Sequence, residues 1–276
     1  MTTHAQLISA TALHSLLGDP DLRIVDATVH LTFDENGAHA ESGADTFAAG
    51  HIPGAIFVDQ IAELSNPAGE APFEAVNSSA FADVVGAHGI GDGSRVVVYD
   101  TANGIWATRL WWQFRLEGHD VEVLDGGLAA WEAAGFVTTT EPTLHQPASF
   151  TASRRAGAIV STADVEAATS DPSVLLVNAL DPDSFAQGHI PGSVNVPFGS
   201  LVNPDGTLKD LTELREIFGA AGALDADVTP IAYCGGGIAA TAVTFALASL
   251  GRDDAAVYDG SMNAWTADPN RPLETP

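Results

Sequence analysis

The chain has 276 residues, 46% of them apolar, and its 36 acidic against 10 basic residues give a formal net charge of −26. This length predicts two domains, each with enough apolar residues for its own core. The negative charge excludes nucleic acid and anionic membranes as partners. No apolar run approaches the roughly 20 residues that span a bilayer. Residues 1–6 show no secretory pattern, so we expect a cytoplasmic protein without internal disulfides, because the chain has one cysteine.

The first half predicts alternating helices and strands. In chain order we expect a helix at 8–17, a strand at 23–27, a helix at 79–85, a strand at 95–99, a helix at 108–117, a strand at 121–124 and a helix at 127–134. Residues 95–99 form a continuous apolar run, which is typical of a buried parallel strand. Residues 30–46 are rich in Asp, Glu, Gly and Ala and predict an exposed loop.

The second half repeats the first. Strands are expected at 174–177, 229–233 and 255–258, and a helix at 240–250. Residues 47–55, which contain His-Ile-Pro-Gly, return 138 positions later as residues 185–193. The pattern predicts an α/β protein of two tandem domains, each a parallel sheet flanked by helices. We place the domains at residues 1–138 and 157–276, joined by a linker at 139–156.

The only cysteine, Cys234, ends a predicted buried strand and is followed by three glycines and a helix. Backbone N–H groups and the positive end of the helix dipole converge at such a point, and both favour the reactive thiolate. The bland alternative is a buried structural cysteine, which needs no glycine-rich loop. We therefore predict that Cys234 is catalytic. The predicted binding loop comprises Gly235, Gly236, Gly237, Ile238, Ala239 and Ala240.

Three other kinds of site compete for this loop. Gly235, Gly237 and Ala240 fit a loose dinucleotide fingerprint, with Asp259 at the ribose-binding spacing. However, Asp125 recurs in the position of Asp259 in the first half, where the loop has no such fingerprint. We therefore assign this Asp to the fold and expect no cofactor.

A cysteine phosphatase needs an arginine where this loop has Ala240, and the next arginine is Arg252. A cysteine–histidine hydrolase needs a histidine base. His51 and His189 both precede Ile-Pro-Gly, and their recurrence in both halves favours a structural turn. No histidine pair has metal-ligand spacing beside a carboxylate or cysteine, so we expect no metal.

The landmarks together resemble the tandem rhodanese family of sulfurtransferases. They are residues 51–55, Arg109-x-Trp111-Trp112, Leu124-Asp125-Gly126-Gly127 with Trp131, and Cys234-x-x-Gly237-Ile238. The resemblance covers essentially the whole chain. It implies a non-catalytic first domain, in which Asp100 stands in place of the cysteine. It also implies that Cys234 takes sulfur from a small donor as a persulfide and passes it to a thiol or cyanide.

Some residues depart from that family's patterns. Gly235 and Gly236 replace the Arg and Lys of the thiosulfate type, and Leu180 replaces an arginine. These changes favour 3-mercaptopyruvate over thiosulfate as donor. The alternative is a partner-dependent or non-enzymatic sulfur carrier that uses a protein thiol as acceptor. His51 and Asp45 are the candidates for a contribution from the first domain across the domain boundary.

Overall fold

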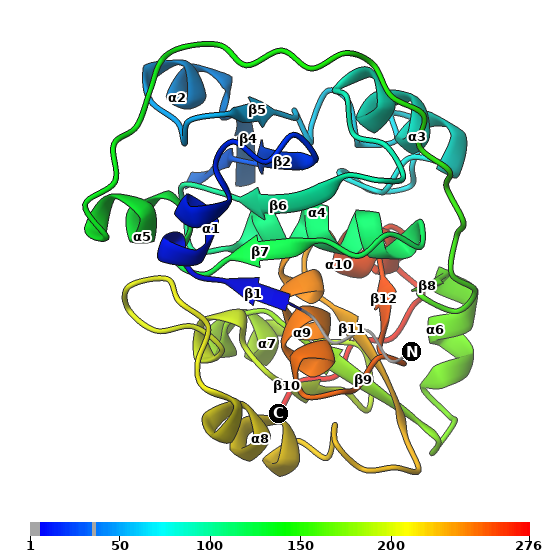
Figure 1. The fold of residues 1–276 in the computed structure, drawn as a ribbon. Helices are drawn as coiled ribbons and strands as arrows, with labels where there is room; N and C mark the ends of the chain where they lie inside the picture. Colours follow the sequence, from blue (N-terminus) through cyan, green and yellow to red (C-terminus); the bar gives the residue numbers. More distant parts are fainter. Residues whose placement is uncertain (1–5, 35–36) are drawn as a thin grey trace.

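The computed structural model describes residues 6–34 and 37–276. Figure 1 shows two α/β domains, one above the other, each built on a five-stranded parallel sheet. The strand order is β1-β7-β6-β2-β5 in the first domain and β8-β12-β11-β9-β10 in the second. In both sheets the first strand of the domain lies at one edge, beside the last. The predicted α/β class and the tandem repeat are therefore confirmed.

The elements of the first half are β1 (Gln6–Ile8), α1 (Ala10–Leu16), β2 (Leu22–Asp26), β3 (Val29–Asp34), β4 (Gly37–Ser42), α2 (Ala44–Ala49), β5 (Ala55–Phe57), α3 (Ser78–Ala87), β6 (Arg95–Tyr99), α4 (Ile105–Leu116), β7 (Glu122–Leu124) and α5 (Gly127–Ala133). Those of the second half are β8 (Ile159–Val160), α6 (Thr162–Ala168), β9 (Val174–Asn178), α7 (Pro182–Gln187), β10 (Val194–Asn195), the 3₁₀ helix η1 (Phe198–Ser200), α8 (Leu211–Ala220), β11 (Thr229–Tyr233), α9 (Ile238–Ser249), β12 (Ala256–Tyr258) and α10 (Ser261–Trp265).

Many helices begin at a side chain that accepts a backbone N–H bond. These capping residues are Ser9, Asn77, Ser161, Asp181 and Asp210. The long helices α4 and α9 begin differently, after Gly104 and Gly237, whose φ angles are 84° and 83°. Glycine has no side chain that could accept a hydrogen bond, so the first N–H groups of these two helices need another acceptor. Because the glycines start the turn, both helices begin two or three residues earlier than predicted.

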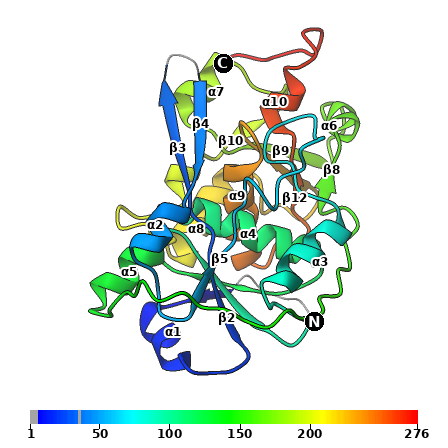
Figure 2. The same cartoon turned by 90° about the horizontal axis from the view of Figure 1, so that it is seen from above.

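The prediction of a loop at residues 30–46 is wrong. Apart from residues 35–36, which lie outside the described residues, this segment forms most of an antiparallel hairpin of β3 and β4 and the first half of α2. Figure 2 shows the hairpin projecting from the first domain. Val29 at its base packs with Trp106 and with Ile238, the first residue of α9. Tertiary contact with the second domain therefore supports this hairpin.

The two domains meet through α4 and α9, which pack side by side. The ring of Trp111 meets Phe245 edge-on, with centroids 4.9 Å apart. The chain between the domains is extended and bonded to the first domain, as when the Arg155 N–H donates to the Leu116 carbonyl at 2.8 Å. No helix in the described ranges is long and apolar enough to cross a membrane.

Candidate active site

Cys234 lies directly after β11, at the carboxyl edge of the second sheet, and its side chain is only 3% exposed. The loop that follows is short, because α9 begins at Ile238. A Cβ built at Gly237 would lie 2.5 Å from the Asp259 carbonyl oxygen. Both this crowding and the left-handed φ angle require glycine at that position. The loop therefore curls back tightly around the cysteine.

The segment that opens α10 holds the cysteine loop from the other side. Ser261 Oγ accepts the Cys234 N–H at 3.1 Å. The N–H groups of Met262 and Asn263 donate to the carbonyls of Cys234 and Gly235 at 3.0 and 2.9 Å. These three bonds tie the cysteine loop to the first turn of α10. Ser261 itself has a φ of 50°, an uncommon angle for a residue other than glycine.

The equivalent loop of the first domain shows what the backbone N–H groups between a central strand and the next helix can bind. Asp100 follows β6 as Cys234 follows β11, and it is fully buried. One carboxylate oxygen accepts from the N–H groups of Ala102 and Gly104 at 2.9 and 3.0 Å. The other accepts from Trp106 and Ala107, both at 2.9 Å. Burial raises the pKa of Asp100, and these four backbone bonds offset part of the rise. The first domain thus holds a carboxyl group where the second presents a thiol.

The side chains nearest to Gly235 and Gly236 are uncharged, whereas Gly237 lies against Asp259. A Cβ at Gly235 would lie 3.9 Å from Leu180 Cδ2, and one at Gly236 would lie 3.7 Å from Phe73 Cδ2. The same Gly236 position would be 3.1 Å from Asn263 Nδ2. Phe73 comes from the first domain, so the donor would meet both domains. None of these three side chains carries a charge that could bind a small anion.

The structure brings together Gly235, Gly236, Gly237, Ile238, Ala239 and Ala240 beside Cys234. The contacts of His51 are with its own domain and with the linker, not with the cysteine loop. His51 Nδ1 lies 2.8 Å from the Phe47 carbonyl, its Nε2 lies 3.2 Å from the Glu141 carbonyl, and its ring stacks on Phe47. Asp45 is exposed in the first turn of α2.

Arg109 was not predicted to be a site residue, although it is one of the family landmarks named above. Its guanidinium is 1% exposed and crosses the domain boundary to Asp259, with Nη1 2.5 Å from Oδ1. The same Nη1 donates to the Gly237 carbonyl at 3.2 Å. The only local signal was an arginine between Thr108 and Leu110 in a mostly apolar helix.

Comparison with known proteins agrees with this geometry. The model of the Rhodanese-like domain family matches residues 9–134 and 161–268. A probable 3-mercaptopyruvate sulfurtransferase of Pseudomonas aeruginosa is 32% identical, with 98% of each chain covered. Thiosulfate sulfurtransferase of Bos taurus is 33% identical, with 89% of this chain and 85% of the bovine one covered. The crystal structure of the 3-mercaptopyruvate enzyme SseA of Escherichia coli superposes with a TM-score of 0.84 at 31% identity, covering 93% and 98% of the two chains.

Replacing Asp100 by alanine separates the two loops experimentally. D100A leaves four N–H donors without their acceptor, two of them buried, which should lower the free energy of unfolding by about 3 kcal/mol. Sulfur transfer per folded molecule should stay close to wild type. Urea unfolding and steady-state kinetics measure the two effects, with exposed Asp83→Ala as control. A folded D100A protein with greatly reduced turnover would contradict this separation.

Asp26, at the end of β2, predicts a pH dependence. Its Oδ1 accepts from the Thr28 N–H at 2.9 Å, whereas its buried Oδ2 has no partner in the structure. Burial raises the pKa of Asp26, and the Thr28 bonds offset part of the rise. The folded chain therefore holds this proton at a pH where the unfolded chain has lost it. Stability falls as pH rises from the ordinary Asp pKa through the raised one.

The variant D26N has no carboxyl group to titrate here, so it should not lose stability over this pH range. Its counterpart in the second domain is Asn178, whose Oδ1 accepts the Leu180 N–H at 2.8 Å, so an amide suits this turn. The difference in unfolding free energy between D26N and wild type should grow in favour of D26N from pH 4 to pH 8. Urea unfolding across this range, with D83N as control, measures it. A difference that does not vary with pH would refute the prediction.

Proposed function

Because the chain belongs to the rhodanese family and is a sulfurtransferase, we propose that Cys234 carries the transferred sulfur as a persulfide. The observation that supports this most directly is the carboxylate of Asp100 in the equivalent loop. The aspartate oxygen is the third atom from the backbone, after Cβ and Cγ. In a cysteine persulfide the outer sulfur is also third, after Cβ and Sγ. Similar sets of backbone N–H groups would then hold an anionic atom at the same number of bonds from the backbone.

Each half-reaction balances without a cofactor. The Cys234 thiolate attacks the sulfur of 3-mercaptopyruvate, the carbon–sulfur bond breaks, and the thiol proton goes to the carbon that becomes the methyl group of pyruvate. The product is a Cys234 persulfide anion. A cyanide or thiolate acceptor then attacks the outer sulfur, and the electron pair of the sulfur–sulfur bond returns to Sγ. The N–H groups at the start of α9 stabilise the negative charge on sulfur throughout.

We propose 3-mercaptopyruvate as the preferred donor over thiosulfate. Leu180, Phe73 and Asn263 around the glycines offer no cation to a thiosulfate dianion. The chain also carries a net charge of −26, which repels a dianion more than a monoanion. The single carboxylate of 3-mercaptopyruvate needs fewer hydrogen-bond donors than the doubly charged thiosulfate. The relatives include enzymes named for either donor, so this choice rests on the residues of this loop.

The uncharged side chains beside Gly235 and Gly236 also favour a second candidate, a carrier that delivers sulfur to a protein thiol. A protein acceptor supplies its binding energy away from the reacting atoms, so it does not need a cationic pocket for a small anion. The two functions differ in acceptor use. A carrier forms the persulfide but turns over only when the acceptor is a protein.

The single cysteine makes the central proposal simple to test. Intact mass spectrometry of wild type after exposure to 3-mercaptopyruvate should show a gain of about 32 Da, one sulfur atom. Cys234→Ser should show no gain and no turnover. Steady-state kinetics with cyanide should give a higher kcat/KM with mercaptopyruvate than with thiosulfate. No adduct with either donor would eliminate the persulfide, and a preference for thiosulfate would eliminate the donor assignment.

Leu180 tests why thiosulfate is disfavoured. L180R places a guanidinium beside Gly235, and one charge-assisted contact is worth about 1.5–3 kcal/mol. The kcat/KM with thiosulfate should therefore rise about 10- to 100-fold, with a smaller change for mercaptopyruvate. L180Q is the matched control, since it adds length and polarity without charge. An equal gain in both variants would show that charge is not the limiting factor.

A further inference from the structure

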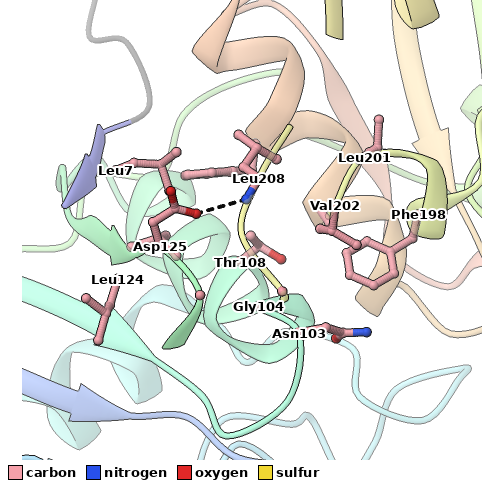
Figure 3. A pocket seen from close by; sticks show the side chains of 15 residues that line it. Leu7, Asn103, Gly104, Thr108, Leu124, Asp125, Phe198, Leu201, Val202 and Leu208 are labelled. Carbon is pink, nitrogen blue, oxygen red and sulfur yellow. Dashed lines mark hydrogen bonds between the residues drawn. The ribbon is translucent and has the colours of Figure 1, made fainter. Parts of the chain in front are cut away.

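The two domains approach each other through matching contacts. Asp259, after β12, accepts the N–H of Ala75 in the first domain at 2.7 Å. Asp125, after β7, accepts the N–H of Leu208 in the second domain at 2.9 Å. Figure 3 shows the Asp125–Leu208 bond at the rim of a small cavity between the domains. Each domain thus presents the same carboxylate to the other.

Only one of these two carboxylates is paired with a buried guanidinium. Arg109 is the fifth residue of α4, and it fills the space beside Asp259. The fifth residue of α9 is Ala242, which lines the cavity near Asp125 instead. That cavity, of about 30 Å³, is apart from Asp125 lined mostly by apolar side chains such as Phe245. Arg109 therefore lies at the cysteine loop, and α9 has an alanine instead of an arginine at the corresponding position.

Arg109 contacts three parts of the site at once. Nη1 bonds to Asp259 at 2.5 Å and to the Gly237 carbonyl at 3.2 Å. Nη2 bonds to the Phe73 carbonyl at 2.5 Å, and the ring of Trp112 lies 4.6 Å from the guanidinium carbon. These groups satisfy a cation that has almost no contact with water, which is the condition for a buried charge to be tolerated.

The bond to Gly237 bears directly on the reactive loop. In α4, the carbonyl of the corresponding Gly104 accepts the Thr108 N–H at 2.9 Å, as an ordinary first turn does. In α9, the Gly237 carbonyl accepts from Arg109 of the other domain. A peptide unit is planar, so holding this carbonyl fixes the plane of the Gly237–Ile238 peptide. Three successive glycines cannot hold that plane by themselves, because glycine is free to rotate.

The bond to Phe73 orders the wall over Gly236. Phe73 has a φ of 66°, which is uncommon for a bulky residue and needs support from its surroundings. Its carbonyl is held by Arg109, and its ring faces the position of a Gly236 Cβ at 3.7 Å. One guanidinium therefore sets both the N–H ring and the first-domain side chain that covers it.

We propose that Arg109, in the domain without a cysteine, is a positioning residue for sulfur transfer: it keeps the start of α9 aimed at Cys234. This inference rests on the proposed role of Cys234 as the sulfur carrier. It gives the first domain a part in the reaction, although no first-domain side chain attacks the substrate. Removing the guanidinium lets the Gly237 peptide turn, so that fewer N–H groups face the sulfur.

The same helix provides a matched control. Arg115 also forms an ion pair across the domain boundary, with Nη2 2.7 Å from Asp253 Oδ1, and also lies over an indole ring. Asp253 belongs to the loop between α9 and β12, at the other end of α9 from Cys234. R109Q and R115Q therefore each remove one inter-domain ion pair, but only R109Q removes a contact with the cysteine loop.

The experiment compares R109Q, R109K and R115Q with wild type. For R109Q, we expect kcat with 3-mercaptopyruvate to fall about 100-fold with a smaller change in KM, the cost of misplacing reacting groups. Alkylation of Cys234 by iodoacetamide at pH 7.5 should slow about tenfold, because fewer N–H groups stabilise the thiolate. R115Q should stay within about threefold of wild type in both assays, whatever its unfolding free energy.

R109K keeps the folded state accessible if R109Q does not fold, because lysine retains the charge toward Asp259. It cannot hold Gly237 and Phe73 together, so its kcat and alkylation rate should lie between those of wild type and R109Q. The alkylation assay uses no sulfur donor, so it tests Arg109 even if Cys234 forms no persulfide. Wild-type alkylation and kcat in folded R109K and R109Q, or equal losses in R115Q, would overturn the proposal.

Discussion

The backbone N–H groups at the start of a buried helix need an acceptor, and this requirement shapes both halves of the protein. α4 and α9 follow a central strand and a left-handed glycine, and both start inside the structure. In the first domain the chain meets the requirement internally, because Asp100 accepts four of these N–H groups. In the second domain the corresponding residue is Cys234, whose thiol is a weak acceptor. Under the proposed function, a persulfide anion on Cys234 would supply the acceptor that Asp100 supplies in the first loop.

This difference explains how two copies of one fold can have different roles. In the first loop, the carboxylate of Asp100 already occupies the N–H groups that a substrate anion would need. From the first domain, α4 packs along α9, and Arg109 and Phe73 reach the cysteine loop. The hairpin of β3 and β4 adds Val29 against Ile238 at the start of α9. The first domain thus stabilises the shape of a loop that three glycines leave flexible.

Local signals in the sequence predicted the repeat, the central strands and the position of Cys234. They did so because buried parallel strands are continuous apolar runs and because glycines mark left-handed turns. The hairpin was missed because the alternation of Val29, Leu31 and Phe33 with polar residues, which is a strand signal, was given less weight than the Gly and Ala content. Its base also packs with Ile238, about 200 positions away along the chain. The pairing of Arg109 with Asp259 was also missed. The sequence reading assigned Asp259 to the fold, and the structure adds its partner, which only tertiary packing can identify.

The same N–H ring limits which donors suit the protein. Asp100 shows that the first loop accommodates one carboxylate, and burial still raises its pKa despite four hydrogen bonds. Backbone N–H groups therefore do not fully replace water around even one buried negative charge. A donor with two charges places the second beyond the ring, next to Leu180, where no hydrogen-bond donor of that side chain can meet it. In a chain with a net charge of −26, the proposed selectivity against a dianion would then follow from what the loop lacks.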